Sequence, residues 1–180
     1  MKMVLDACVI YPTVMREMLL GVARTGAYTP LWSARILEEW ALAARKLGPE
    51  GEIQARGEIA MAQAAFPHAS IAVHAGLETR LWLPDANDIH VLATAVHGNA
   101  DGIVTMNAKD FPRGLLAEEG LSRNDPDAFL LGHFHAEPDA VDAVVAKVLG
   151  KARSLSGQDW TLRALLKKAR LPRLAKALSA

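Results

Sequence analysis

Four aspartates stand close together in residues 83–112 and are interleaved with apolar residues. They are Asp85, Asp88, Asp101 and Asp110. Carboxylates repel one another when they are gathered, so a protein that groups them needs a cation to compensate their charge. Oxygen ligands of this kind suit hard divalent metals such as Mg²⁺. The stretch therefore predicts a metal site, if the fold brings the carboxylates together.

The elements of this stretch would direct carboxylates from two places towards one region. From residue 88 to 96 the apolar residues recur at helical spacing, and Asn87 is a candidate N-cap. Residues 102–105 are expected to form a short buried strand, followed by a loop over 107–110. The start of a helix and the loop after a strand would thus present their polar side chains to the same region.

The N-terminus adds a further carboxylate. Residues 3–5 are apolar and are followed by Asp6, which predicts a buried parallel strand that ends at this aspartate. Open α/β sheets bind their ligands at the carboxyl ends of the strands. A helix over 34–47, with Ser33 as its N-cap, would place Glu39 after a second strand. Both segments would therefore direct an acid towards the carboxyl edge of one sheet.

Strands and helices alternate along the chain, which is typical of a parallel sheet with helices on both faces. Besides the elements above, strands are expected over 28–32, 67–73 and 120–122, and helices over 11–23, 52–66, 74–82, 113–119, 125–130, 138–152, 160–169 and 172–178. The predicted fold class is α/β, a three-layer α/β/α sandwich with a central parallel sheet, plus C-terminal helices. We expect one domain over residues 1–137 and a basic helical extension over 138–180.

The net charge of zero conceals an uneven distribution. Residues 1–140 hold 18 acids against 11 lysines and arginines, a net charge of −7. Residues 141–180 hold 9 lysines and arginines against 2 acids, a net charge of +7. A basic tail of this kind indicates contact with an anionic partner or with the acidic part of the chain.

The sequence disfavours several classes of protein. It has no apolar run of the roughly 18 residues that a membrane helix needs, and its start lacks the pattern of a secretory signal. The single Cys8 excludes an internal disulfide and zinc sites built on paired cysteines, which fits a reducing cytoplasm. No glycine motif for nucleotide binding occurs, and residues 6–8 lack the second aspartate of a haloacid-dehalogenase phosphatase.

Four segments resemble, in their order and spacing, the motifs of the PIN domain. They are VLDACVI near the N-terminus, LEEW, LPDANDIHVLATA and IVTMNAKDFP. The PIN domain is the fold of many metal-dependent ribonucleases and of the VapC-type toxins of bacterial toxin–antitoxin pairs. The resemblance spans residues 3 to about 131 and implies an α/β/α fold and Mg²⁺ or Mn²⁺ as the cofactor.

The resemblance implies that the metal is held, and the reaction catalysed, by Asp6, Glu39, Asp88 and Asp110. Glu39 fits the family pattern better than Glu38, which we expect to be solvated. Asn107 competes with Asp110 for the fourth position and, because it carries no charge, is expected to orient ligands or water. Thr105 and Ser33 stand where the family often has small hydroxyl residues that support the acids.

Other residues of these motifs allow two interpretations. Asp85 either supports the metal site or forms a turn, and Asp101 is expected at a turn or at the start of a strand. His90 and His97 share one predicted helix and could form a transition-metal pair. We expect ordinary surface or core histidines instead, because hard oxygen ligands suit the acidic set better.

Cys8 departs from the family pattern, which usually has Asn or Ser at this position. The departure weakens a hydrogen bond to Asp6 without removing a ligand. Beside an apolar strand, Cys8 is expected to pack as a small hydrophobic residue. The tryptophans are likewise expected to pack, unless an exposed one stacks on a base.

The implied function is hydrolysis of RNA phosphodiester bonds by a metal-dependent endoribonuclease, the toxin of a type II pair. The alternative is a catalytically inactive PIN module that binds RNA or protein. The expected partners are an RNA substrate and a VapB-like antitoxin, with no membrane, and a homodimer stays open. In the tail, the residues expected to guide the RNA backbone are Arg163, Lys167, Lys168 and Arg170, although a solvated helix face and an antitoxin-binding surface also stay open.

Overall fold

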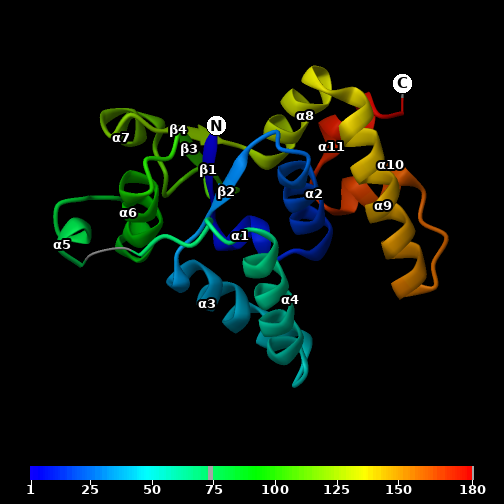
Figure 1. The fold of residues 1–180 in the computed structure, drawn as a ribbon, viewed down its shortest axis with the longest axis horizontal. Helices are drawn as coiled ribbons and strands as arrows, with labels where there is room; N and C mark the ends of the chain where they lie inside the picture. Colours follow the sequence, from blue (N-terminus) through cyan, green and yellow to red (C-terminus); the bar gives the residue numbers. More distant parts are fainter. Residues whose placement is uncertain (73–74, 180) are drawn as a thin grey trace. The chain divides into compact units, whose positions relative to one another are not determined.

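The computed structural model describes residues 1–72 and 75–179 (Figure 1). The chain packs into two compact units. The first, here called the sheet unit, comprises Met1–Tyr11 and Thr29–Asn124. The second, the helical unit, comprises Pro12–Tyr28 and Asp125–Ala180. Buried apolar side chains fill both units.

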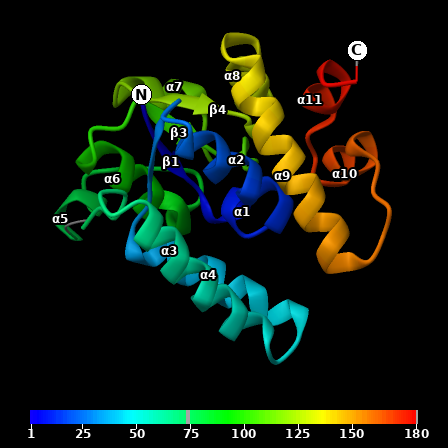
Figure 2. The same ribbon diagram turned by 45° about the vertical axis from the view of Figure 1, so that its right-hand side comes forward.

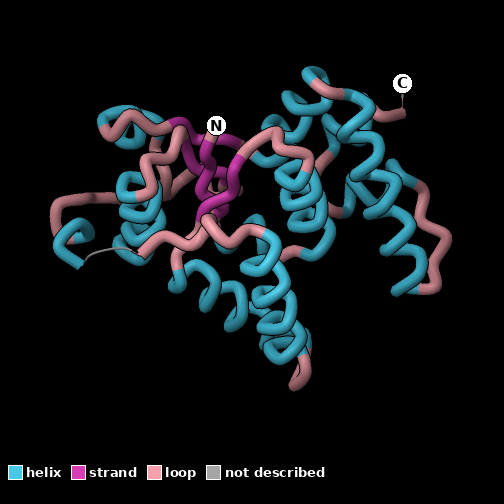
Figure 3. The backbone as a smooth tube through the Cα atoms, in the orientation of Figure 1, coloured by secondary structure: helices cyan, strands magenta, loops and turns pink. Residues whose placement is uncertain are grey.

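The sheet unit is built on four parallel strands in the order β2-β1-β3-β4, drawn in magenta in Figure 3. They are β1 (Lys2–Leu5), β2 (Thr29–Leu31), β3 (Gly102–Val104) and β4 (Ser122–Asn124). Val4 of β1 pairs with Leu31 on one side and with Ile103 on the other. All three residues are buried, as expected for the centre of a parallel sheet, whereas the edge strand β4 is polar.

The predicted α/β fold with a central parallel sheet and C-terminal helices is confirmed. The strand expected over 67–73 is reduced, in the part of the chain that the structure describes, to one bridge between Trp32 and Ser70. Pro67 offers no amide to a ladder, which disfavours a longer strand there. Val73 and His74, the end of that strand and the start of the helix expected over 74–82, lie outside the described residues.

The α-helices of the sheet unit are α1 (Ala7–Ile10), α3 (Ala34–Ala43), α4 (Gly51–Ala65), α5 (Ala75–Glu78), α6 (Ile89–His97) and α7 (Arg113–Glu118). Two short 3-10 helices adjoin them: Ala44–Leu47 continues α3, and Ala86–Asp88 precedes α6. Ser33 caps α3 as predicted, because its hydroxyl accepts a hydrogen bond from the Ile36 amide at 3.3 Å. Gly48 has a φ of 109°, which a glycine adopts easily, and α4 then packs against α3 (Figure 2).

Arg56 of α4 links α4 to α3. Its guanidinium donates to Glu38 of α3 at 2.8 and 2.9 Å and to Glu52 at 2.6 Å. The hydrogen bonds from Arg56 lower the pKa of Glu38. Glu38, expected to be solvated, is exposed but also paired, so it serves helix packing.

The helical unit consists of α2 (Thr13–Arg24), α8 (Pro126–Ala136), α9 (Pro138–Ser156), α10 (Leu162–Lys168) and α11 (Pro172–Ala177). Helix α2 packs closely on α9, since any side chain at Gly21 would collide with Val144. Buried Asp127 accepts hydrogen bonds from the amides of Arg173 and Leu174 at 2.8 and 3.0 Å, which joins α8 to the start of α11.

The C-terminal residues thus pack with a helix from the N-terminal part of the chain. The division into domains at residues 137 and 138 stays a prediction from the sequence. Among the helices in the described residues, none combines the length and the apolar character that crossing a membrane requires.

Candidate metal centre

Asp6 lies at the carboxyl end of β1, at the centre of the sheet. It is only 6% exposed, and its backbone amide donates to the Val104 carbonyl at 3.2 Å. Its carboxylate accepts a hydrogen bond of 2.7 Å from the hydroxyl of Thr105, which directly follows β3. The Asn107 amide in turn donates to that hydroxyl at 2.9 Å. Neighbouring parallel strands therefore place Asp6 and the loop after β3 at the same edge of the sheet.

Cys8, which was expected to pack as a small hydrophobic residue and to weaken a hydrogen bond to Asp6, contacts Asp6 through its thiol. Its Sγ donates to Oδ2 of Asp6 at 3.1 Å and accepts from the Met106 amide at 3.3 Å. Burial and the charge of Asp6 raise the pKa of Cys8 to about 12. The thiol therefore stays protonated near neutral pH and keeps a weak hydrogen bond to Asp6 where the family has an amide or a hydroxyl.

Asp88 is the point at which the acids of the sheet unit meet. Its pKa is raised to about 6 by burial, followed by the charges of Asp6, Asp85, Asp110 and Glu39 in that order. The side-chain amide of Asn107 donates to Oδ2 of Asp88 at 3.0 Å. The other three acids named from the sequence thus all act electrostatically on Asp88, and Asn107 lies where it can orient Asp88.

Asp85, Asp88 and Asp110 form the tightest group within this set. Each offers a carboxylate oxygen, and these oxygens lie within 4.8 Å of one another. Asp85 also caps the turn before α6, since it accepts hydrogen bonds from the backbone and side-chain amides of Asn87 at 2.9 and 3.0 Å. The expected N-cap role of Asn87 is therefore wrong. Asp85 forms the turn and also lies beside the other acids, so the two interpretations that the sequence left open are compatible.

Glu39 reaches the same region from α3 and contacts a buried histidine. Nε2 of His90 lies 2.8 Å from Oε1 of Glu39, and Arg35 lies 3.5 Å from that oxygen. His90 is 2% exposed, and within the described residues neither ring nitrogen has a well-aligned hydrogen bond. Nε2 of His90 is therefore close to the Glu39 carboxylate but does not make a hydrogen bond of good geometry with it.

His90 was not predicted to belong to the site, because an ordinary surface or core histidine was expected there. One signal was its place beside Val91 and Leu92, in a run of buried apolar residues. A buried imidazole needs a polar partner, so a histidine at such a position indicates one nearby.

Arg123 of β4 fixes the loop that carries Asn107 and Asp110. One guanidinium nitrogen donates to the carbonyl oxygens of Ala108 and Phe111 at 2.7 and 3.0 Å. Phe111 is fully buried and anchors the end of the loop. Arg123 was not among the predicted residues, because its partners are backbone atoms that no sequence pattern marks.

Two other predicted residues lie outside the group. Ser33 acts through the helix that it caps, which carries Glu39, and no contact between its hydroxyl and an acid is present in the described part of the chain. Asp101 accepts a hydrogen bond of 2.7 Å from the Lys2 amide, so it joins the starts of β1 and β3. Its predicted place at the start of a strand is confirmed.

The raised pKa of Asp88 predicts that its charge destabilises the metal-free fold. The folded protein binds this proton more tightly than the unfolded chain, whose aspartate pKa is 3.8. Stability should therefore fall as the pH rises from about 4 to about 6, and should stay low above that range. In EDTA at pH 7.5, Asp88→Asn should melt at a higher temperature than the wild type, and the difference should shrink at pH 4. An equal or lower melting temperature at pH 7.5 would contradict the mutual repulsion of these acids.

Comparison with protein families gives a match over residues 2–109 to the family model of the PIN domain. The match covers more than half of the 180 residues and includes Asp6, Glu39 and Asp88, and it ends one residue before Asp110. Neither the curated proteins nor the solved structures with which the chain was compared gave a match.

Proposed function

Because the chain belongs to the PIN-domain family, we propose that it is a Mg²⁺- or Mn²⁺-dependent endoribonuclease and the toxin of a VapB–VapC pair. PIN domains are typically metal-dependent nucleases, and the acidic group is compatible with metal binding. The observation that carries the proposal is the gathering of carboxylates around Asp88: oxygens of Asp85, Asp88 and Asp110 lie within 4.8 Å of one another, and burial and the neighbouring acids raise the pKa of Asp88. A toxin of this kind would act on RNA in the cytoplasm and be held inactive by a VapB-like protein.

The donor set suits a hard divalent cation. Every candidate ligand is a carboxylate, and the mutual repulsion of these groups is what a cation would relieve. Asp6, Glu39, Asp88 and Asp110 would hold the metal, with Asp85 beside them. When bound, Mg²⁺ or Mn²⁺ would polarise the scissile phosphate and lower the pKa of the attacking water.

Neighbouring side chains would keep the acids in place for this chemistry. Thr105 and Cys8 donate to Asp6, and Asn107 donates to Asp88. His90 packs against Glu39. Each contact restricts the orientation of a carboxylate before the metal binds. Groups that orient metal ligands in this way usually increase the affinity for the metal.

Cleavage of RNA by the purified protein tests this proposal. A single-stranded RNA should be cut when Mn²⁺ is present and should stay intact when EDTA removes it. RNA that binds the protein but is never cut, under any divalent metal, would favour the alternative of an inactive PIN module. The presence of all four predicted acids disfavours that alternative.

His90 provides a test of the surroundings of the acids. Replacing it by phenylalanine removes one of the two polar neighbours of Glu39, the other being Arg35, and should weaken Mn²⁺ binding by about 10- to 100-fold, the usual cost of losing a group that orients a ligand. His90→Gln keeps a donor and should have a smaller effect. Calorimetric titration of both variants with Mn²⁺ measures this, with melting curves to verify the fold. Equal affinity of wild type and His90→Phe would show that His90 only packs.

The basic residues of the tail are proposed to guide RNA. Arg163, Lys167, Lys168 and Arg170 are all exposed, as binding to phosphates requires. Neutralising them together should weaken RNA binding and flatten its salt dependence by about one unit of slope for each phosphate that the variant no longer binds. Arg170 has a φ of 62°, so asparagine is the appropriate substitute there, and glutamine elsewhere.

The cleavage rate at saturating RNA should hardly change in this variant, because phosphate contacts position the substrate without taking part in the reaction. Glutamine at Lys2 and Lys46, two exposed lysines of the sheet unit, is the control for loss of charge. If the salt slope stays at the wild-type value, the basic tail does not guide RNA, and binding of the antitoxin becomes its proposed role.

A further inference from the structure

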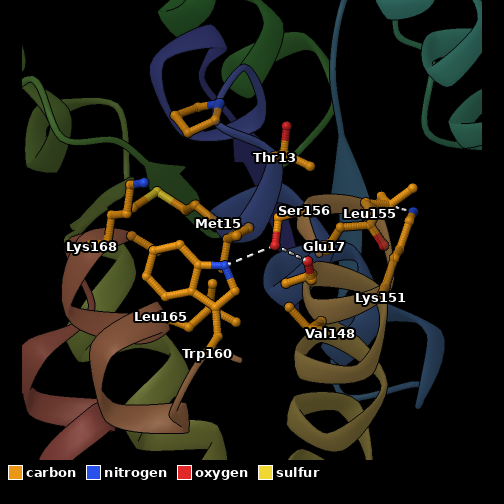
Figure 4. Close-up of a pocket in the computed structure, with 14 residues that line it drawn as sticks. Thr13, Met15, Glu17, Val148, Lys151, Leu155, Ser156, Trp160, Leu165 and Lys168 are labelled. Carbon is orange, nitrogen blue, oxygen red and sulfur yellow. Dashed lines mark hydrogen bonds and ion pairs between the residues drawn. The ribbon is translucent and has the colours of Figure 1, made fainter. Parts of the chain in front are cut away.

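An apolar cavity of about 350 Å³ lies within the helical unit (Figure 4). The start of α2, the end of α9 and α10 surround it, and its walls include the buried side chains of Met15, Val148 and Leu165 and the ring of Trp160. Leu155 also lines it and is 74% exposed, so the cavity opens to solvent. Its volume is that of a small-molecule site, for which roughly 300–1,000 Å³ is usual.

Four polar side chains around the cavity already take part in hydrogen bonds or an ion pair, as the dashed lines in Figure 4 show: Glu17, Lys151, Ser156 and Trp160. The hydroxyl of Ser156 donates to the Ala152 carbonyl at 2.7 Å and accepts from the Trp160 indole at 3.1 Å. Lys151 pairs with Glu17 at 2.9 Å. A nucleobase or a sugar would regain only a few of the hydrogen bonds to water that it loses here, which disfavours both as ligands. An apolar group has no hydrogen bonds to water to lose when it enters the cavity.

Lys168 is the charged group that remains for a ligand. Its ammonium lies 4.8 Å from the centre of the Trp160 ring. Lys151 is neutralised by Glu17, but within the described residues no ion pair joins Lys168 to a carboxylate. A lysine ammonium is a compact point charge, which suits a ligand that carries a single negative charge.

We propose that this cavity binds a small amphipathic carboxylate. Its apolar body fills the space beside Trp160 and Val148, and its carboxylate pairs with Lys168. The site needs no metal, so its chemistry differs from that of the acids of the sheet unit. Lys168 is shared with the residues proposed to guide RNA, so the carboxylate and an RNA phosphate would compete for its ammonium. It would let a small molecule bind to the unit that carries the basic tail.

Titration of the full chain with sodium octanoate tests the proposal, with 1-octanol as the uncharged match. Two readouts are used, calorimetry and the NMR signal of the Trp160 indole N–H, assigned by its loss in Trp160→Phe. Octanoate should shift this signal and bind more tightly than octanol. Lys168→Gln should weaken octanoate binding by roughly tenfold and leave octanol unaffected, since a hydrogen bond to a charged group is removed. Lys176→Gln, an exposed lysine on α11, is the matched control.

A second variant, Ala152→Phe, places a ring in the cavity and should abolish binding of both molecules, with the melting curve to verify the fold. The proposal is overturned if millimolar octanoate leaves the Trp160 signal unchanged, or if Lys168→Gln and Lys176→Gln bind octanoate equally. A single-stranded RNA that shifts this signal when octanoate does not would also overturn it, because the cavity would then belong to the path of the RNA. None of these outcomes depends on cleavage activity, so the proposed nuclease function stands or falls separately.

Discussion

Replacing Asp88 by asparagine should lower the rate of Mn²⁺-dependent RNA cleavage by at least about 100-fold. Loss of a group that merely orients a ligand costs about 10- to 100-fold, and loss of the central carboxylate should cost more. Asp88 is the acid on which the charges of Asp6, Glu39 and Asp110 converge. Asparagine has nearly the same volume, so the fold should survive and only the charge is removed. Initial rates on a single-stranded RNA, together with melting curves, measure the effect.

Two matched variants separate the site from the rest of the acidic residues. Asp101→Asn makes the same chemical change where the carboxylate accepts from the Lys2 amide, and it should keep the wild-type rate. The cleavage rate of Asp85→Asn should lie between those of Asp88→Asn and Asp101→Asn, because one oxygen of Asp85 already accepts hydrogen bonds from Asn87. A correctly folded Asp88→Asn with the wild-type rate would exclude Asp88 from the reaction.

Expression of the wild type without an antitoxin should arrest bacterial growth, and expression of Asp6→Ala should not. Asp6 is the most buried of the proposed metal ligands and is held by Thr105 and Cys8, so its loss removes the acid at the centre of the sheet. The measurement is the number of surviving cells after induction, with protein levels compared by immunoblot.

Cys8→Ser is the control, because it changes the side chain that donates to Asp6 and leaves Asp6 itself in place. Serine restores a hydroxyl donor to Asp6, so this variant should arrest growth as the wild type does. Arrest by Asp6→Ala at equal protein level would show that toxicity needs no cleavage, which favours a module that acts by binding.

The acids were predictable because local sequence marks the ends of the elements that carry them. The apolar run before Asp6 predicts a strand, and parallel strands bring their carboxyl ends to one edge of a sheet. Ser33 marks the start of the helix with Glu39, and its cap is present. The contact between Thr105 and Asp6 depends in addition on the pairing of β1 with β3, which the structure shows and the sequence did not predict.

Contacts between distant elements could not be predicted in this way. His90 and Glu39 meet because α6 and α3 are brought together by the fold, and neither sequence pattern names the other. The packing of α2 on α9 depends on the missing side chain of Gly21 facing Val144, far along the chain. Local choices between similar residues failed too, since Asp85 and Asn87 are both good caps and only Asp85 accepts the amide hydrogen bond.

The most direct test of the metal-dependent mechanism is cleavage of an RNA with a single phosphorothioate at the cleaved bond. Sulfur in place of a phosphate oxygen binds Mg²⁺ poorly but binds softer metals better. If the carboxylates around Asp88 hold a metal against the scissile phosphate, the substitution should slow cleavage strongly with Mg²⁺, and Mn²⁺ should restore much of the rate. Equal slowing with both metals, or none with either, would contradict a metal bound between these acids and the RNA.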